Sequence, residues 1–256
     1  MLALLIALSG CSVLERARSN FWELERGPSG QAPDPATTRE AVIQVYAART
    51  VGWRGVFAVH TWISVKPRDA EFYTRYEVIG WGVDRGAPAV RINRSGADNY
   101  WFGDRPELLV DVRGEAADPL VSRVEAAVAS YPYPMSYRTW PGPNSNTFIA
   151  WIGRSVPELR LKLPPTAIGK DFLPGSVAGT TPSGTGVQLS LFGLTGLAVG
   201  WEEGIEVNLL TLNFGVEVKP PALKLPMIGR IGPSGRSHPD AEPPSAHASP
   251  AENTGK

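Results

Sequence analysis

Alternating apolar and polar residues predict several β-strands in the first half of the chain. Residues 56–65 (VFAVHTWISV) are rich in β-branched and aromatic side chains, which is typical of a strand. A period of two places His60 and Trp62 on the same face of this strand. Together with three further predicted strands it forms an antiparallel sheet over residues 53–102; the further strands lie at 73–83, 90–93 and 99–102.

Apolar residues at helical spacing predict two long helices downstream of this sheet. In residues 118–130, Asp118 is a suitable N-cap and Pro119 suits the first helical position. Residues 144–154 (NSNTFIAWIGR) predict the second helix, with three side chains turned toward the core: Phe148, Ile149 and Ile152.

A shorter helix is predicted near the start of the domain, over residues 39–48. Thr37 or Thr38 would cap it. Its apolar side chains then share one face, namely Val42, Val45 and Tyr46.

The last third of the chain predicts a β extension followed by a polar tail. Residues 187–199 and 205–218 read as two or three strands, and their dense apolar content predicts a buried sheet or a hairpin that packs on the main domain. The glycine-rich loop 175–186 lacks a phosphate-loop pattern, so we assign no nucleotide to it. Residues 232–256 are polar with five prolines and are predicted to be disordered.

The N-terminus predicts export and lipidation. Residues 1–10 contain a short apolar run that suits a signal peptide, although the usual basic residues before it are missing. The run ends in Leu-Ser-Gly before Cys11, which resembles a bacterial lipobox and implies palmitate and diacylglycerol on that cysteine. Ser12 favours the outer membrane by resemblance to sorting patterns. The alternative is a buried N-terminal helix with a free thiol.

This reading places a folded domain in the periplasm on a lipid anchor. Residues 11–36 form a lipidated tether, and residues 37–231 form one α+β domain. Equal numbers of basic and acidic residues (25 each) give no reason to expect a nucleic-acid partner. With one cysteine, and with His238 and His247 in the tail, we predict neither a metal site nor a cofactor.

Residues 141–148 (PGPNSNTF) hold the strongest candidate for chemistry. Ser145 lies at the start of a predicted helix, where the helix dipole stabilises a developing anion. His60 would act as the base, and Glu77 on the next strand would orient it. Asn144 or backbone N–H groups would bind the oxyanion. The alternatives are a plain helix cap, a core histidine and a solvated carboxylate.

Aromatic residues offer a second kind of site. They would line an apolar cleft or stack on sugar rings, or else serve as core and rim residues. Arg138 and Lys170 could bind an anion or lie on the surface. The aromatic set comprises Trp62, Trp81, Trp101, Trp140, Tyr131, Tyr133 and Tyr137.

Several segments, among them 53–67 and 131–148, resemble an uncharacterised bacterial family catalogued as domain of unknown function 3750. The resemblance covers residues 40–232 and implies no established activity. A strand histidine before an Asn-x-Asn-x-Phe helix start also resembles circularly permuted papain-like proteins, which include the lecithin:retinol acyltransferase-like group. That resemblance puts His60 at the base position and Ser145 at the nucleophile position, between Asn144 and Asn146.

Two functions therefore remain open for an α+β envelope lipoprotein, for which the second resemblance implies a papain-like fold. One is a Ser/His hydrolase or acyltransferase acting on cell-envelope amides or esters. The other is a non-catalytic lipoprotein that binds a ligand or a protein partner through its aromatic cleft, with Trp62, Tyr137 and Trp140 as binding residues.

Overall fold

The structure, a computed structural model, describes residues 23–233. The predicted signal peptide, Cys11 and nearly all of the polar tail lie outside these residues, as do His238 and His247. No helix formed by residues 23–233 combines the length and the apolar character needed to cross a membrane.

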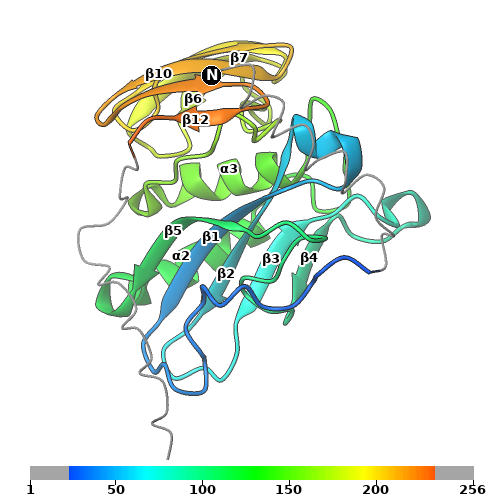
Figure 1. The fold of residues 1–256 in the computed structure, drawn as a ribbon, viewed down its shortest axis with the longest axis vertical. Helices are drawn as coiled ribbons and strands as arrows, with labels where there is room; N and C mark the ends of the chain where they lie inside the picture. The colour runs from blue at the N-terminus through cyan, green and yellow to red at the C-terminus, as the bar shows by residue number, and fades with distance from the viewer. Residues whose placement is uncertain (1–22, 234–256) are drawn as a thin grey trace, which may run out of the picture.

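Two antiparallel sheets and two α-helices make up the described part of the chain, which confirms the predicted α+β class. The helices are α2 (Asp118–Ala129) and α3 (Ser145–Ser155). Figure 1 shows α3 between the two sheets. Four short 3-10 helices join the elements: η1 (Gly52–Val56), η2 (Val83–Arg85), η3 (Gly114–Ala116) and η4 (Pro157–Leu159).

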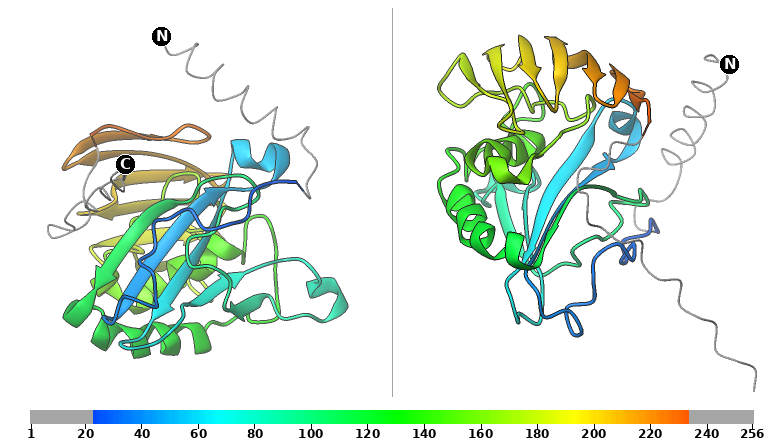
Figure 2. Two further views of the ribbon diagram at one scale, coloured as in Figure 1. Left: turned by 60° about the horizontal axis from the view of Figure 1, so that its bottom comes forward. Right: turned by 90° about the vertical axis from the view of Figure 1, so that its left-hand side faces the viewer.

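The first sheet has five strands in the order β4-β3-β2-β1-β5, so β1 and β2 are central. Both views of Figure 2 show the helices on one of its faces. The strands are β1 (Val42–Arg49), β2 (Val59–Lys66), β3 (Thr74–Val78), β4 (Val90–Asn93) and β5 (Glu107–Arg113).

The second sheet has seven strands in the order β12-β11-β10-β9-β8-β7-β6, each paired with its sequence neighbour. It lies on the far side of α3 from the first sheet (Figure 1). The strands are β6 (Ala178–Thr180), β7 (Gly186–Leu191), β8 (Thr195–Gly200), β9 (Gly204–Leu209), β10 (Leu212–Val218), β11 (Pro221–Leu225) and β12 (Gly229–Ile231).

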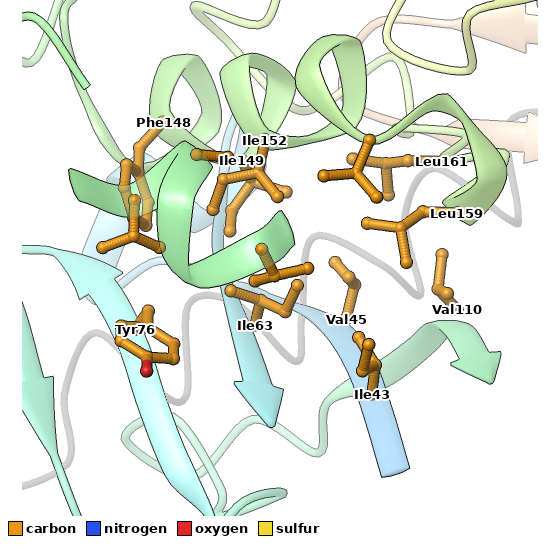
Figure 3. Close-up of a cluster of buried hydrophobic side chains, with 14 of the residues drawn as sticks. Ile43, Val45, Ile63, Tyr76, Val110, Phe148, Ile149, Ile152, Leu159 and Leu161 are labelled. Carbon is orange, nitrogen blue, oxygen red and sulfur yellow. The ribbon is translucent and has the colours of Figure 1, made fainter. Parts of the chain in front are cut away.

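The main hydrophobic core fills the space between α2, α3 and the five-stranded sheet (Figure 3). From the sheet side, Ile43 and Ile63 point toward Ile149 and Ile152 of α3, and all four are buried. Each such side chain contributes roughly 1.5–3 kcal/mol relative to exposure. The prediction that Phe148, Ile149 and Ile152 face the core is confirmed.

The predicted helix over residues 39–48 is wrong, because Val42–Arg49 form strand β1. This strand pairs with β2 on one side and β5 on the other, and both of its faces are covered. A central strand buried on both faces has apolar residues on both faces, so it lacks the alternation that marks a half-buried strand. Val42, Val45 and Tyr46 then matched a helical spacing by coincidence.

Several other boundaries differ from the prediction. Residues 52–56 form η1 before β2, and residues 99–102 take part only in isolated bridges. Asp118 is the first residue of α2 rather than its cap, since Ala117 precedes it with no side-chain cap. Strand β4 lies where it was predicted, at residues 90–93.

Part of the predicted tether packs on the domain. Asp98 accepts hydrogen bonds from the Ser29 hydroxyl at 2.8 Å and from the Gln31 backbone N–H at 2.5 Å. Pro28 also bridges to Asn99. Residues 28–32 therefore belong to the folded part, and the spacer ends before them.

The predicted β extension is present, but its dense apolar side chains are not buried. Its apolar side chains face outward, and its polar side chains face α3 and the loop before the sheet. Gln188 of β7, for example, is buried and accepts from Arg154 of α3 at 2.8 Å. The inward-facing set comprises Gln188, Ser190, Glu206, Asn208, Asn213, Glu217 and Lys224.

Candidate functional site

The predicted contact between His60 and Glu77 is present on neighbouring strands β2 and β3. His60 Nε2 lies 2.9 Å from Glu77 Oε2. The same carboxylate accepts from Arg75 at 2.8 Å and from Asn93 at 3.1 Å. Because an ionised carboxylate only accepts hydrogen bonds, this contact assigns the proton of neutral His60 to Nε2.

Burial and charge fix the protonation of this cluster in opposite ways. Burial lowers the pKa of His60, and the neighbouring Glu77 offsets only part of that effect. Burial alone would raise the pKa of Glu77, but the hydrogen bond from His60 and the charge of Arg75 lower that pKa to about 2. At neutral pH the cluster is therefore a neutral imidazole beside an Arg75–Glu77 ion pair.

Aromatic rings cover His60 and close it off from solvent. Its ring stacks on Trp101 with centroids 3.8 Å apart, and it is also stacked against Trp62. Trp101 in turn stacks on Trp81 at 6.0 Å, and Trp81 is 56% exposed. The stack therefore runs from a buried histidine to an indole ring that faces solvent.

Asn144 caps helix α3 and joins it to two loops. Its side-chain oxygen accepts from the backbone N–H groups of Asn146 and Thr147 at 3.0 and 3.1 Å. Its amide group donates to the carbonyls of Thr139 and Ile168. Binding an oxyanion would need a free N–H donor on the Asn144 side chain, but both of its amide N–H bonds already donate to these two carbonyls.

Asn146 ties the start of α3 to the five-stranded sheet. Its amide group donates to the carbonyls of Val59 at 3.0 Å and Ile168 at 2.8 Å. Its oxygen accepts from the Thr61 hydroxyl at 3.0 Å. Asn146 is buried, and its side chain connects helix α3 to strand β2 and to the loop that contains Ile168. These contacts give the second asparagine of the Asn-Ser-Asn motif a structural role.

The structure does not bring Ser145 and His60 together. Thr61 of β2 contacts α3, whereas His60, the preceding residue, points to the opposite face of the sheet. That opposite face carries Trp62, Arg75 and Glu77. Ser145 is the first residue of α3 and lies in the helix layer. The sheet itself separates the predicted nucleophile from the predicted base, so this pairing is wrong.

The predicted aromatic set divides into separate groups and does not line one cleft. Trp62 is fully buried, with its indole N–H on the carbonyl of Ala97. Tyr131 packs in the helix layer against Phe148. Trp140 is half exposed, and its indole N–H donates to the Thr211 hydroxyl at 2.8 Å. Thr211 lies in the turn between β9 and β10 of the seven-stranded sheet, away from the ring stack on His60.

Tyr137 and the two basic candidates take different positions. The Tyr137 ring packs on Gly80, where a Cβ atom would clash with it. Arg138 is exposed, and its backbone N–H donates to the carbonyl of Pro143 at 2.7 Å. Lys170 is buried and ion-paired with Asp171 and Glu206, so it is not a surface anion site.

A buried charge network beneath the seven-stranded sheet was missed by sequence reasoning. Glu206 pairs with Lys170 and Lys224, and Lys224 also contacts Glu217 at 3.0 Å. The signal lay in the alternation itself, because Glu206, Glu217 and Lys224 sit at every second position among apolar residues. Alternation alone does not reveal which face is covered. Among residues 23–233 no group of three or more His, Cys, Asp or Glu side chains is arranged to hold a metal ion.

Fold and site together define a two-sheet α+β protein with an aromatic-covered histidine and no Ser/His pair. Comparison with known families matches residues 40–172 to the family described as "Protein of unknown function (DUF3750)". The chain belongs to this family. No curated protein and no solved structure matches it, so nothing supports the papain-like resemblance. The family match ends before the seven-stranded sheet begins.

Proposed function

We propose that this protein is a lipid-anchored envelope protein that acts by binding and not by Ser/His hydrolysis. The observation that carries the proposal is the placement of His60 and Ser145 on opposite sides of the five-stranded sheet. A general base must come within hydrogen-bond reach of the hydroxyl it deprotonates, directly or through one water. A sheet between the two groups prevents this.

The surroundings of His60 also favour a structural role. The imidazole is held by Glu77, covered by Trp101 and lowered in pKa by burial. A base needs an open path to its substrate, and the stacked indole blocks that path. Any hydrolysis measured with the purified protein is therefore expected to be unchanged in Ser145→Ala. A clear loss in that variant would overturn the non-catalytic assignment.

The exposed end of the aromatic stack is the proposed ligand-binding surface. Trp81 presents a flat ring that Trp101 and Phe102 hold in place. Such a rigid ring suits a sugar or another ring-bearing envelope ligand. Soluble peptidoglycan fragments are the first probe, read by tryptophan fluorescence. Trp81→Ala should abolish the response, whereas Trp53→Ala, which removes another exposed indole outside the stack, should retain it.

The anchor is tested separately from the binding surface. Radiolabelled palmitate should enter the wild-type protein and should not enter Cys11→Ala. Equal labelling of both proteins would remove the lipoprotein assignment. The family match and the fold would stand in either case, since both rest on residues 23–233.

A further inference from the structure

The outer face of the seven-stranded sheet is a continuous apolar surface. The strand registers align its side chains in rows that cross the strands. The longest row runs Val187, Val199, Ile205, Val216, Leu223 and Ile231. The next row runs Leu189, Leu197, Val207 and Phe214. These side chains are at least 40% exposed.

This face offers almost no hydrogen-bonding groups. The third row holds Leu191, Thr195 and Leu209, and Thr195 is its polar member. The Thr195 hydroxyl donates to the carbonyl of Asn208 at 3.1 Å, so it is engaged within the sheet. From strand spacing and rise, the five strands β7–β11 present roughly 500 Å² when viewed face-on. A contiguous apolar patch of that size marks an interaction surface.

Apolar side chains continue past the strands into the turns at both ends of the sheet. Phe192 and Leu210 project from the turns at one end, and each is 68% exposed. Trp201 lies in the β8–β9 turn at the other end, with the ammonium group of Lys219 5.2 Å from its ring centroid. A tryptophan beside a lysine at the border of an apolar surface is typical of a membrane–water boundary.

We infer that this outer face seats the protein on the hydrocarbon surface of a lipid bilayer. The inference rests on the proposed envelope lipoprotein and assigns a second membrane contact to it. A protein partner would normally supply about one hydrogen bond per 100–200 Å² of interface, and the strands of this face offer only the hydroxyls of Thr180 and Thr195 to receive them. Acyl chains need none. A stacked second sheet would also leave the apolar turns uncovered, whereas a bilayer extends past both ends.

The sheet lies flat on the membrane and does not enter it edge-first. An open sheet has unpaired backbone groups at its two edges, here β6 and β12, and these cannot be placed in hydrocarbon. The polar inner face is covered by the rest of the fold, so only the outer face meets lipid. A shallow, open hollow on this face lies along β7 and β8 and is lined in part by Leu189 and Leu197.

The start of the described chain lies near this sheet. Glu25 accepts from the backbone N–H of Gly103 at 2.8 Å, and neighbouring Asp104 accepts from that of Arg49 at 2.6 Å. The Arg49 side chain then donates to the carbonyl of Met227, in the turn between β11 and β12, at 3.0 Å. The residues between Cys11 and Glu23 can span at most about 40 Å. A lipid on Cys11 would therefore hold the outer face close to the same membrane.

The test is sedimentation of the mature chain, residues 11–256 carrying Cys11→Ser and without the predicted signal peptide, with vesicles of phosphatidylethanolamine and phosphatidylglycerol. This protein has no lipid, so its binding reports the sheet. The double variant Leu197→Glu, Val207→Glu should bind about tenfold more weakly or worse, since charges are placed against hydrocarbon. The matched control is Ile92→Glu, an exposed apolar strand residue on the other sheet. It should bind as the parent does.

Each outcome decides the point. Both sheet positions are at least 40% exposed, so circular dichroism and melting temperature should match the parent. If the double variant is less folded, Leu197→Thr with Val207→Thr replaces it, and reduced binding is again expected. Unchanged vesicle binding would overturn the inference. So would a dimer of the parent, seen by light scattering, that the double variant separates while vesicles bind neither protein. Failed palmitate labelling would remove the anchor alone, because this assay contains no lipidated protein.

Discussion

The ionised Glu77 carboxylate, which is hydrogen-bonded to His60 and Arg75, makes the free energy of unfolding depend on pH in the acid range. Its pKa falls from 4.5 to about 2 in the folded protein. A carboxylate with a depressed pKa stabilises the fold fully above its unfolded pKa and loses that contribution as the pH falls toward the folded value. The shift corresponds to roughly 3 kcal/mol. We expect the free energy of unfolding to fall steeply between about pH 4.5 and pH 2.

The matched variants for this prediction are Glu77→Gln and Glu71→Gln. Urea unfolding above and below that window should show a weaker pH dependence for Glu77→Gln, together with lower stability at neutral pH. The exposed Glu71 makes no such buried pair, so its variant should follow the wild type. The lowered pKa of His60 adds to the acid sensitivity, because below about pH 6.5 the unfolded chain binds a proton that the folded chain resists. An equal pH slope in Glu77→Gln and wild type would contradict this account.

Asn146 and Ser145 should differ sharply despite being adjacent. Asn146→Ala removes three buried hydrogen bonds and leaves the carbonyl of Val59 and the hydroxyl of Thr61 without these partners, whereas the carbonyl of Ile168 keeps its bond from Asn144. Each unsatisfied buried group costs about 1–3 kcal/mol, so we expect a loss of roughly 3 kcal/mol or more. Ser145→Ala should change stability by less than about 1 kcal/mol, since Asn144 and not Ser145 caps the helix. Thermal melts of the two variants provide the comparison.

At the scale of elements, the sequence identified both α-helices, each of which buries one face. Helices α2 and α3 each have one apolar stripe and were predicted within a residue or two. Strand β1 lies between β2 and β5 and is covered on both faces. It was mistaken for a helix because its apolar residues lie on both faces and so lack the alternation of a half-buried strand. Strand β5 was not predicted at all.

The contact between His60 and Glu77 was predictable from two adjacent strands, but the pairing with Ser145 was not. Both faces of β2 carry apolar or aromatic residues, so the sequence does not show which face α3 covers. The contact of α3 with Thr61 settles it. The same limitation applies to the seven-stranded sheet, where dense apolar content predicted a buried sheet or a packed hairpin, whereas the apolar side chains lie on the exposed outer face.

Glu206 should be the most sensitive polar position of the seven-stranded sheet. It pairs with both Lys170 and Lys224, and all three side chains are at least 98% buried. Glu206→Ala leaves Lys170 with Asp171 and Lys224 with Glu217 as weaker partners. Breaking a buried ion pair typically costs about 3–5 kcal/mol. We expect a loss of that size in denaturant unfolding, against less than about 1 kcal/mol for Val207→Ala, the exposed neighbour.

At the scale of the whole molecule, polarity is layered in an unusual order. An aliphatic core joins the five-stranded sheet to the helices, a polar and charged layer joins the helices to the second sheet, and an apolar face ends the stack (Figure 1). Ordinary soluble proteins place such an apolar face inside. The buried charges beneath the sheet hold it in this orientation, since turning it over would leave Lys170 buried against apolar side chains without Glu206 as its partner.

This layering predicts two membrane attachments that reinforce each other in the cell. The lipid on Cys11 would keep the domain near the bilayer, where the apolar outer face meets the membrane at a high effective concentration. Each attachment should therefore strengthen the other. The prediction compares four proteins by fractionation: wild type, Cys11→Ser, the Leu197→Glu, Val207→Glu variant and their combination, with residues 1–10 of both Cys11→Ser proteins replaced by a cleavable signal peptide that does not direct lipidation. Wild type should stay with membranes through a carbonate wash, and each single change should release part of it. The combination should be fully soluble. If the sheet variant stays as firmly bound as wild type while Cys11→Ser alone releases all the protein, the anchor acts by itself and the outer face has another partner.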